Sequence, residues 1–199
     1  RTEITKLHHR LQTTFIYVTH DQTEALTMGT RIVVMKDGFI QQVDTPQNVF
    51  DYPSNLFVAG FIGSPQMNFF DVKLERRGED VMAVFGENVI KVPEGKIKKL
   101  VDPSYVGKTV KMGIRPENLH DEELFLQNSP DSIIDADVEV VELMGSETYL
   151  YLKTVDSGIN FIARVDARST SRAGDRIKIA IDANRLHFFD VDTEASILN

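Results

Sequence analysis

The sequence contains no cysteine among its 199 residues. Disulfides, thiolate catalysis and cysteine-based zinc or iron–sulfur sites are therefore excluded, and such a composition fits a reducing compartment such as the cytoplasm. Long hydrophobic runs are also missing, since no apolar stretch approaches the ~20 residues that span a bilayer. The first residues lack the charged segment, apolar stretch and cleavage site of a signal peptide. We therefore expect a cytoplasmic chain that does not itself cross a membrane.

Positive charge is scarce. The chain has 22 Lys and Arg against 30 Asp and Glu, which gives a formal net charge of −8 and a pI near 5.1. An acidic surface repels nucleic acid and anionic lipid, so we expect no nucleic-acid partner. With 42% hydrophobic and 26% charged residues, the composition is that of an ordinary globular protein.

The first residues already follow a helical repeat. Ile4, Leu7, His8 and Leu11 recur at steps of three and four, which places them on one helix face. No capping residue precedes this helix. We therefore expect the chain to be a piece of a longer protein whose start lies upstream.

Residues 14–63 alternate strand and helix signals, which favours an α/β arrangement. The run Phe15–Val18 predicts a strand buried on both faces of a mostly parallel sheet. Asp21–Glu24 is a capping box, in which Asp21 accepts from the Glu24 N–H and the Glu24 side chain reaches back to start a helix that Gly29 ends.

A hairpin and a short helix are expected next. Arg31–Met35 and Phe39–Val43 predict paired strands around the Asp37-Gly38 turn. Thr45-Pro46 combines an N-cap with a first-turn proline, so a helix should begin there and end at Tyr52-Pro53.

After Gly63 the pattern changes to short β segments separated by turn residues. Such a series favours small barrels or a sandwich. The expected strands are 69–76, 81–85, 89–92, 108–114, 134–143, 148–155, 159–165, 177–181 and 186–189. We therefore expect two domains, 1–62 and 63–199. The first holds five Lys/Arg and six Asp/Glu, and the second holds seventeen and twenty-four, so the acidity belongs mainly to the second.

His20 is the candidate functional residue. It follows the expected strand Phe15–Val18 and precedes the capped helix, where open α/β sheets bind ligands. A neutral imidazole can donate one hydrogen bond to a phosphate oxygen and accept another, which suits a phosphate sensor. A lone histidine at a strand end can equally satisfy backbone groups, so the surrounding sequence has to decide between these interpretations.

That surrounding sequence resembles a known family. Five strings resemble the ATP-binding subunits of sugar-importer ABC transporters of the maltose, multiple-sugar and glycerol-phosphate class. They are Val18-Thr19-His20-Asp21-Gln22, Arg31–Gly38, Gln42–Pro46, Phe57–Phe69 and Gly113-Ile114-Arg115-Pro116-Glu117. The resemblance implies the carboxyl-terminal α/β part of an ABC ATPase domain, followed by a regulatory domain of oligonucleotide-fold-like (TOBE/MOP-like) small barrels.

The resemblance also implies a function. In that family the histidine matching His20 is the switch histidine that contacts the γ-phosphate of ATP. The phosphate loop, signature segment, magnesium-binding strand end and glutamate base are absent from this chain, so we expect ATP and magnesium to serve the full-length protein and this fragment to be inactive. Permease subunits at the inner face of the cell membrane, a second ATPase subunit and regulatory proteins are the implied partners.

The β-rich region has two functional interpretations. The resemblance favours an interaction module that dimerises and receives regulatory signals. The alternative is a small-oxyanion site, because Gly145-Ser146-Glu147-Thr148 is loosely similar to domains that bind molybdate, although the same residues predict a hairpin turn. A complete stand-alone signalling protein is a third interpretation, which the uncapped first helix disfavours.

The remaining polar residues predict structural roles. His8 and His9 point about 100° apart on a helix, and His120 and His187 are distant in sequence, so we expect no metal site. Capping explains Asp21. Glu117, Asp121, Glu122 and Glu123 are expected to form a solvated loop.

Overall fold

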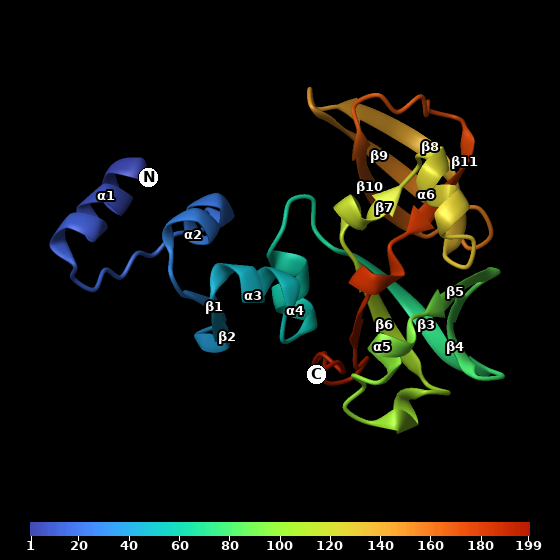
Figure 1. The fold of residues 1–199 in the computed structure, drawn as a ribbon, viewed down its shortest axis with the longest axis horizontal. Coiled ribbons are helices and arrows are strands. Elements are labelled where there is room, and N and C mark those ends of the chain that lie inside the picture. Colours follow the sequence, from blue (N-terminus) through green and yellow to red (C-terminus); the bar gives the residue numbers. More distant parts are fainter. The chain divides into compact units, whose positions relative to one another are not determined.

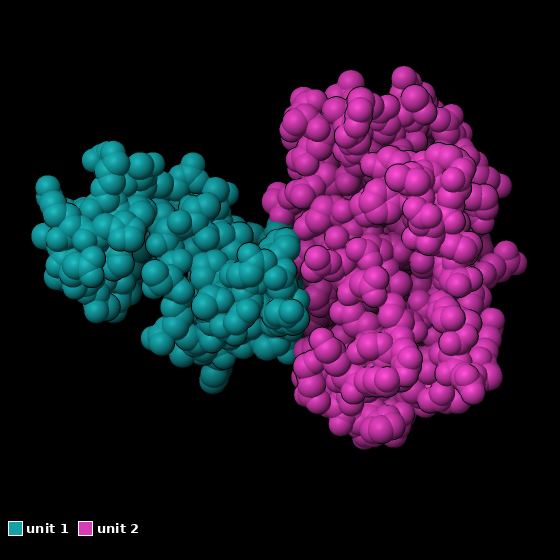
Figure 2. Space-filling model, viewed as in Figure 1, with its two compact units in different colours: residues 1–63 teal, residues 64–199 magenta.

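Two units make up the chain in the computed structural model, which describes all of residues 1–199. They are Arg1–Gly63 and Ser64–Asn199 (Figure 2). The division falls one residue after the expected boundary. No helix in either unit is both long and apolar enough to span a bilayer.

The first unit is mainly helical and contains one hairpin (Figure 1). Its elements are α1 (Thr2–Leu11), α2 (Gln22–Met28), β1 (Ile32–Lys36), β2 (Phe39–Asp44), α3 (Pro46–Asp51) and α4 (Leu56–Phe61). β1 and β2 pair antiparallel around Asp37-Gly38, as the turn signal predicts. Thr45 caps α3 by accepting from the Asn48 N–H, which confirms the predicted helix start.

The prediction for Phe15–Val18 is wrong, because this segment forms no strand. The only sheet of the first unit is the antiparallel β1–β2 hairpin, so no neighbouring strand is available to pair with the segment. Ile16 and Val18 are 90% and 91% exposed as a result. An apolar, β-branched sequence favours a strand, but it needs hydrogen-bonding partners and a covered face to become one.

The second unit is built from two five-stranded sheets. One sheet has the order β12 (His187–Phe189), β6 (Thr109–Ile114), β3 (Asn68–Arg77), β4 (Asp80–Phe85) and β5 (Asn88–Val92). The other has the order β10 (Asn160–Asp166), β9 (Glu147–Thr154), β8 (Ile133–Leu143), β11 (Arg176–Ile181) and β7 (Leu119–His120). All nine predicted β segments are strands, and only the two-residue β7 was missed.

Short helices connect these strands. They are α5 (Glu94–Ile97), η1 (Pro103–Tyr105), η2 (Pro116–Asn118), α6 (Glu123–Asn128) and η3 (Ala183–Arg185). The edge strands β10 and β7 contact each other, so their sheet curls almost into a barrel. Figure 1 shows both sheets strongly curved rather than flat.

One hydrophobic core joins the two sheets. It contains alternate residues of the strands from both, which follows from the two-residue period of a strand with one buried face. Phe70 of β3 contacts Phe85 of the same sheet and Phe161 of the other, with ring centroids 5.0 and 5.7 Å apart. The sheets therefore cannot separate without exposing aromatic side chains.

Asn68 provides the polar link between the sheets. Its side chain donates to the Ile114 carbonyl at 3.3 Å and to the Ile162 carbonyl at 2.9 Å, and it accepts from the Ile162 N–H at 2.8 Å. Asn68 is 9% exposed. Because Ile114 lies in β6 and Ile162 in β10, this one amide satisfies backbone groups of both sheets.

We predict that Asn68→Ala lowers the free energy of unfolding by about 1–3 kcal/mol, because it leaves buried backbone groups without partners. Urea unfolding followed by circular dichroism measures the change. Asn160→Ala is the matched control, since Asn160 is exposed on the same strand as Ile162. Equal effects of the two substitutions would contradict the proposed link.

Candidate functional site

His20 lies in a tight bend between the extended segment and α2. Thr19 and Glu24 define this bend. The Thr19 hydroxyl donates to Glu24 Oε2 at 2.6 Å and accepts from the Asp21 N–H at 2.9 Å. Glu24 Oε2 also accepts from the Tyr17 hydroxyl at 3.2 Å, and this hydrogen bond raises the pKa of Tyr17. The residues on either side of His20 are thus held in place.

Only half of the predicted capping box forms. Asp21 accepts from the Glu24 N–H at 3.1 Å, as predicted. The Glu24 carboxylate does not reach back to the Asp21 N–H, which donates to Thr19 instead. The Glu24 carboxylate instead accepts from the hydroxyls of Thr19 and Tyr17. The start of the helix is therefore held by more side chains than the two of the capping box.

Gln22 connects this helix start to the end of α4. Its side chain accepts from the Gly63 N–H at 2.7 Å and donates to the Phe61 carbonyl. The last turn of a helix leaves backbone carbonyls without intrahelical partners, and Gln22 satisfies one of them. The contact spans about 40 residues of sequence, so the His20 bend is fixed to the far end of its unit.

The His20 side chain itself is exposed and makes no hydrogen bond or ion pair. Nothing satisfies its ring nitrogens, so the structural interpretation, in which this histidine satisfies backbone groups, has no support from its contacts. An exposed imidazole on a fixed bend is available to a ligand.

In the second unit, Gly113 opens the Gly-Ile-Arg-Pro-Glu string inside β6. A Cβ at this position would lie 2.5 Å from Met67 Sδ and 3.3 Å from both Phe69 and Phe189. Glycine is therefore required for these three side chains to pack over the strand. Arg115 and Pro116 of the same string are buried, so this string is part of the packed interior.

The segment Gly145–Thr148 begins in the turn of the β8–β9 hairpin and ends in β9. Gly145 has a φ of +86°, and the Met144 N–H donates to the Glu147 carbonyl at 2.8 Å. The predicted hairpin turn is therefore present, and Gly145 supplies the positive φ that it requires. Thr148 points into the sheet's buried side and is 1% exposed, so its hydroxyl is not presented to an oxyanion at the surface.

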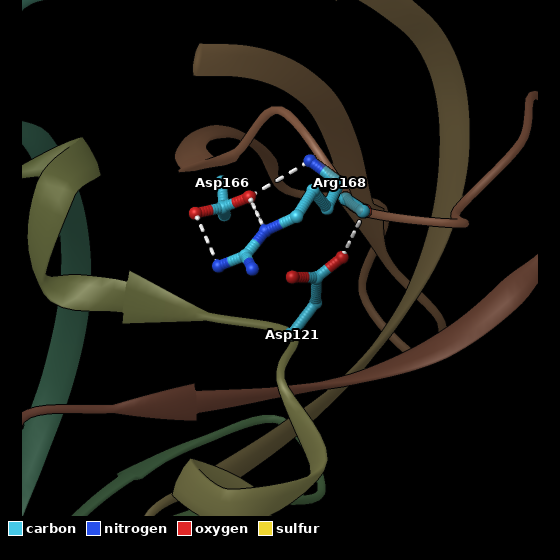
Figure 3. Close-up of polar contacts among 4 residues, drawn as sticks. Asp121, Asp166 and Arg168 are labelled. Carbon is cyan, nitrogen blue, oxygen red and sulfur yellow. Dashed lines mark hydrogen bonds and ion pairs between the residues drawn. The ribbon is translucent and has the colours of Figure 1, made fainter. Parts of the chain in front are cut away.

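Asp121 is the centre of a polar cluster in the second unit (Figure 3). Its carboxylate accepts from the Ser169 hydroxyl and, at 2.9 Å, from the Ser171 hydroxyl. Arg168 in the same loop forms a bidentate pair with Asp166, with nitrogen–oxygen distances of 2.9 and 3.3 Å. These contacts fasten the loop that follows β10, and we assign them a structural role.

This cluster corrects the prediction of a solvated loop for residues 117–123. Glu117 belongs to η2, Asp121 binds the two serines, Glu122 precedes α6 and Glu123 begins it. The prediction rested on charge alone. In the structure these residues are held by two short helices and by hydrogen bonds from serines distant in the sequence. His120 stacks on Phe125 of α6 with centroids 3.8 Å apart.

The five histidines do not converge. His8 and His9 have ring centroids 5.8 Å apart on α1, while His187 lies on β12 and His120 on β7. No group of three or more His, Asp or Glu side chains is close enough together to hold a metal ion.

Comparison with known proteins shows which proteins this chain resembles. Residues 63–119 match the MalK OB fold domain, and residues 112–189 match the TOBE domain. The chain is 54% identical over 197 residues to the oligosaccharides import ATP-binding protein MsmX of Bacillus subtilis, covering 99% of this chain and 52% of that protein. The chain matches sugar-import ABC ATP-binding proteins. The β-rich unit therefore consists of small OB-fold and TOBE barrels.

Other relatives agree. The multiple sugar-binding transport ATP-binding protein MsmK of Streptococcus mutans is 44% identical over 208 residues, covering 99% of this chain and 54% of that protein. The osmoprotective compounds uptake ATP-binding protein GgtA of Synechocystis is 46% identical over 199 residues, with 99% and 52% covered. The chain thus spans about half the length of the curated relatives it matches.

A solved structure of the cytoplasmic molybdate-binding protein ModG aligns with a TM-score of 0.48 at 16% identity, covering 61% of this chain and 94% of that chain. So distant a likeness does not bear on what this chain binds.

The sequence predicts only a packing or surface role for His187. In the structure this histidine is half-buried among positively charged side chains. Burial, together with the positive charges of Arg115, Lys96 and Arg185, lowers the pKa of His187 to about 3. Of the charged neighbours that lower this pKa, only Arg185 is close to His187 in the sequence, two residues before it. Lys96 and Arg115 come near only through the fold.

We predict that the free energy of unfolding falls as the pH is lowered from 6.5 towards about 4.5. The unfolded chain binds a proton at His187 in this range, whereas the folded chain does not until near pH 3. The contribution is at most about 1.4 kcal/mol per pH unit. His187→Gln should flatten the slope in urea unfolding, and an unchanged slope in that variant would contradict the assignment.

Proposed function

We propose that this chain is the carboxyl-terminal part of an ATP-hydrolysing subunit that energises carbohydrate import through an ABC transporter. The observation that carries the proposal is the similarity to sugar-import ATP-binding proteins along 99% of the chain, with 54% identity to one of them. Residues 1–62 are then the end of the ATPase domain, and residues 63–199 are its regulatory domain.

Uncovered apolar surface in the first unit supports the idea that residues 1–62 are part of a larger domain. One face of the β1–β2 hairpin carries four apolar side chains, and their exposed fractions range from 43% to 61%. These residues are Val33, Met35, Ile40 and Val43. The unpaired segment 15–18 adds Ile16 and Val18, both almost fully exposed. Apolar β surface of this kind is normally buried against further strands.

In this proposal His20 is the switch histidine that contacts the terminal phosphate of ATP. Its exposure, its free ring nitrogens and its fixed backbone support the assignment. ATP and magnesium serve the longer protein. The residues present in this chain do not fit the complete nucleotide site, because they offer one imidazole without a phosphate loop or a carboxylate cluster.

The partners follow from the same proposal. ATP hydrolysis drives transport through permease subunits in the cell membrane. The chain acts on the cytoplasmic side of that membrane as a peripheral subunit. The regulatory domain pairs with a second ATPase subunit and receives signals from regulatory proteins. The oxyanion alternative has less support, because its candidate segment Gly145–Thr148 begins in a hairpin turn and ends in β9, where Thr148 is buried.

We predict that the isolated 199-residue chain binds no ATP with magnesium in isothermal calorimetry, whereas the longer protein does. The reason is that the triphosphate cradle lies outside this chain. Binding in the low micromolar range by the isolated chain would contradict the proposal.

The longer protein provides the complementary test of His20. His20→Ala should lower ATP hydrolysis by roughly 100-fold or more, as removal of one transition-state contact does. His9→Ala is the control, because His9 is an exposed histidine on α1. Hydrolysis that is unaffected by His20→Ala would refute the assigned role.

A further inference from the structure

β8 is longer than the strand that pairs with it on one side (Figure 1). β11 pairs with residues 133–137 of β8. One residue further on, the Val138 N–H donates to the Asp175 carbonyl and the Val138 carbonyl accepts from the Gly174 N–H, both at 2.8 Å. Beyond this point, no backbone hydrogen bond reaches residues 139–143 from any segment except β9. The second half of β8 is therefore a free strand edge.

The loop after β10 leaves this edge free because it is fastened elsewhere. Its residues Ser169 and Ser171 donate to Asp121, which directly follows β7. In the order of the sheet, β7 lies on the far side of β11 from β8. The loop therefore bonds to the backbone of β8 only at Gly174 and Asp175, and it does not continue along residues 139–143.

The free edge carries apolar side chains on both faces of the sheet. Val141 and Leu143 pair with residues of β9 that are buried, so both lie on the core face. Val140 and Glu142 alternate with them and lie on the outer face. Leu143 is 77% exposed and Val140 is 51% exposed. Exposed apolar side chains along an unpaired edge favour the addition of another strand.

Glu142 is the one unpaired charge of the hairpin. Its carboxylate accepts from the Tyr151 hydroxyl at 2.8 Å and forms no ion pair. The other carboxylates of β8 and β9 each form an ion pair at 2.8–3.2 Å. They are Asp135, Asp137, Glu139 and Glu147, which pair with Lys178, Arg176, Lys153 and Arg164. A strand that joins this edge can therefore place a cation beside Glu142 without breaking an existing ion pair.

The neighbouring loop does not alter this balance of charge. Residues 166–175 contain two aspartates and two arginines, so the loop adds no net charge. Arg168 pairs with Asp166. The Arg172 guanidinium donates to the Ser171 carbonyl rather than to a carboxylate of β8. The edge therefore keeps a surplus of one negative charge, at Glu142.

The same glutamate disfavours a second copy of this chain as the added strand. If two of these edges paired antiparallel about Val141, their two Glu142 side chains would lie on the same face in diagonal positions. Natural sheets use charged side chains on edge strands to prevent such self-pairing. A basic strand of another protein is favoured instead, because its lysine or arginine attracts Glu142.

We propose that residues 139–143 of β8 form a docking site for an extended basic segment of a partner protein, which joins the sheet as a further strand. Main-chain hydrogen bonds to the free edge hold the segment in place. Its apolar residues lie beside Val141 and Leu143, and a lysine or arginine between them lies beside Glu142. The segment therefore alternates apolar and basic residues.

This docking site is independent of the proposed ATP chemistry. All of its residues lie in the second unit, whereas His20 lies in the first. It depends only on the strand pairing and the charges of this chain. Failure of a basic peptide to bind would leave the role of His20 untouched, and failure of the ATPase assignment would leave the free edge in place.

The test uses the whole 199-residue chain and a fluorescent synthetic peptide. The peptide alternates Val and Lys over about six residues, a common strand length. Fluorescence anisotropy measures binding, and hydrogen exchange followed by NMR shows where the peptide binds. Amides within residues 139–143 that exchange rapidly in the free chain should become protected.

Two control peptides separate charge from strand pairing. A peptide with Glu in place of Lys should bind about tenfold more weakly or worse, because it meets Glu142 with like charge. A Val–Lys peptide with every backbone amide methylated keeps its charge but cannot donate to the edge. It should also bind about tenfold more weakly or worse.

Substitutions locate the site. Glu142→Lys should weaken binding of the Val–Lys peptide about tenfold and strengthen binding of the Val–Glu peptide, because it reverses the charge of the edge. Glu79→Lys is the matched control, since Glu79 is exposed in the turn between β3 and β4 of the other sheet. Circular dichroism checks the fold, and Glu142 is exposed, so its substitution leaves the core intact.

Four results would overturn the docking site. The first is equal binding of the Val–Lys and Val–Glu peptides, and the second is an equal loss of binding in Glu79→Lys and Glu142→Lys. The third is protection of amides only outside residues 139–143. The fourth is self-association that Leu143→Lys abolishes, without binding of either peptide, which would assign the edge to a second copy of this chain.

Discussion

Every apolar β segment needs a neighbour that pairs with its backbone and a surface that covers its side chains. The second unit meets this requirement with its own residues, because two five-stranded sheets share one core and Asn68 satisfies backbone groups of both. The first unit does not. The segment 15–18 has no partner, and the β1–β2 hairpin leaves one apolar face uncovered. This contrast supports our proposal that the first unit is part of a larger ATPase domain, whereas the second is a regulatory domain that folds with its own residues.

The strands of the second unit could be predicted from the sequence because each combines β-branched and aromatic residues with turn residues at its ends. Their pairing order could not, since the two-residue β7 and the contact between β10 and β7 depend on residues far apart in the chain. The hairpin at Asp37-Gly38 and the cap at Thr45 were predictable for the same local reason.

The failures share one physical cause, which is competition from partners that local sequence does not specify. Phe15–Val18 has the composition of a buried strand but lacks a neighbour within the chain. The Glu24 carboxylate is taken by Thr19 and Tyr17 rather than by the backbone of Asp21. Asp121 was expected in solvent, yet two serines about 50 residues away donate to it.

The candidate site was predictable only in part. His20 was identified from the surrounding motif, and the structure adds that its backbone is fixed by Thr19 and Gln22 while its side chain remains free. The contact between Gln22 and Gly63 was not predictable, because the two residues are about 40 positions apart in the sequence.

Hydrogen exchange at the segment 15–18 tests the central claim most directly. The amides of Ile16 and Val18 should exchange rapidly in this chain, because the segment is unpaired and exposed. In the longer protein that we propose, the same amides should be strongly protected by pairing with strands of the completed domain. Equally rapid exchange in both proteins would contradict the claim that residues 1–62 are part of a larger ATPase domain.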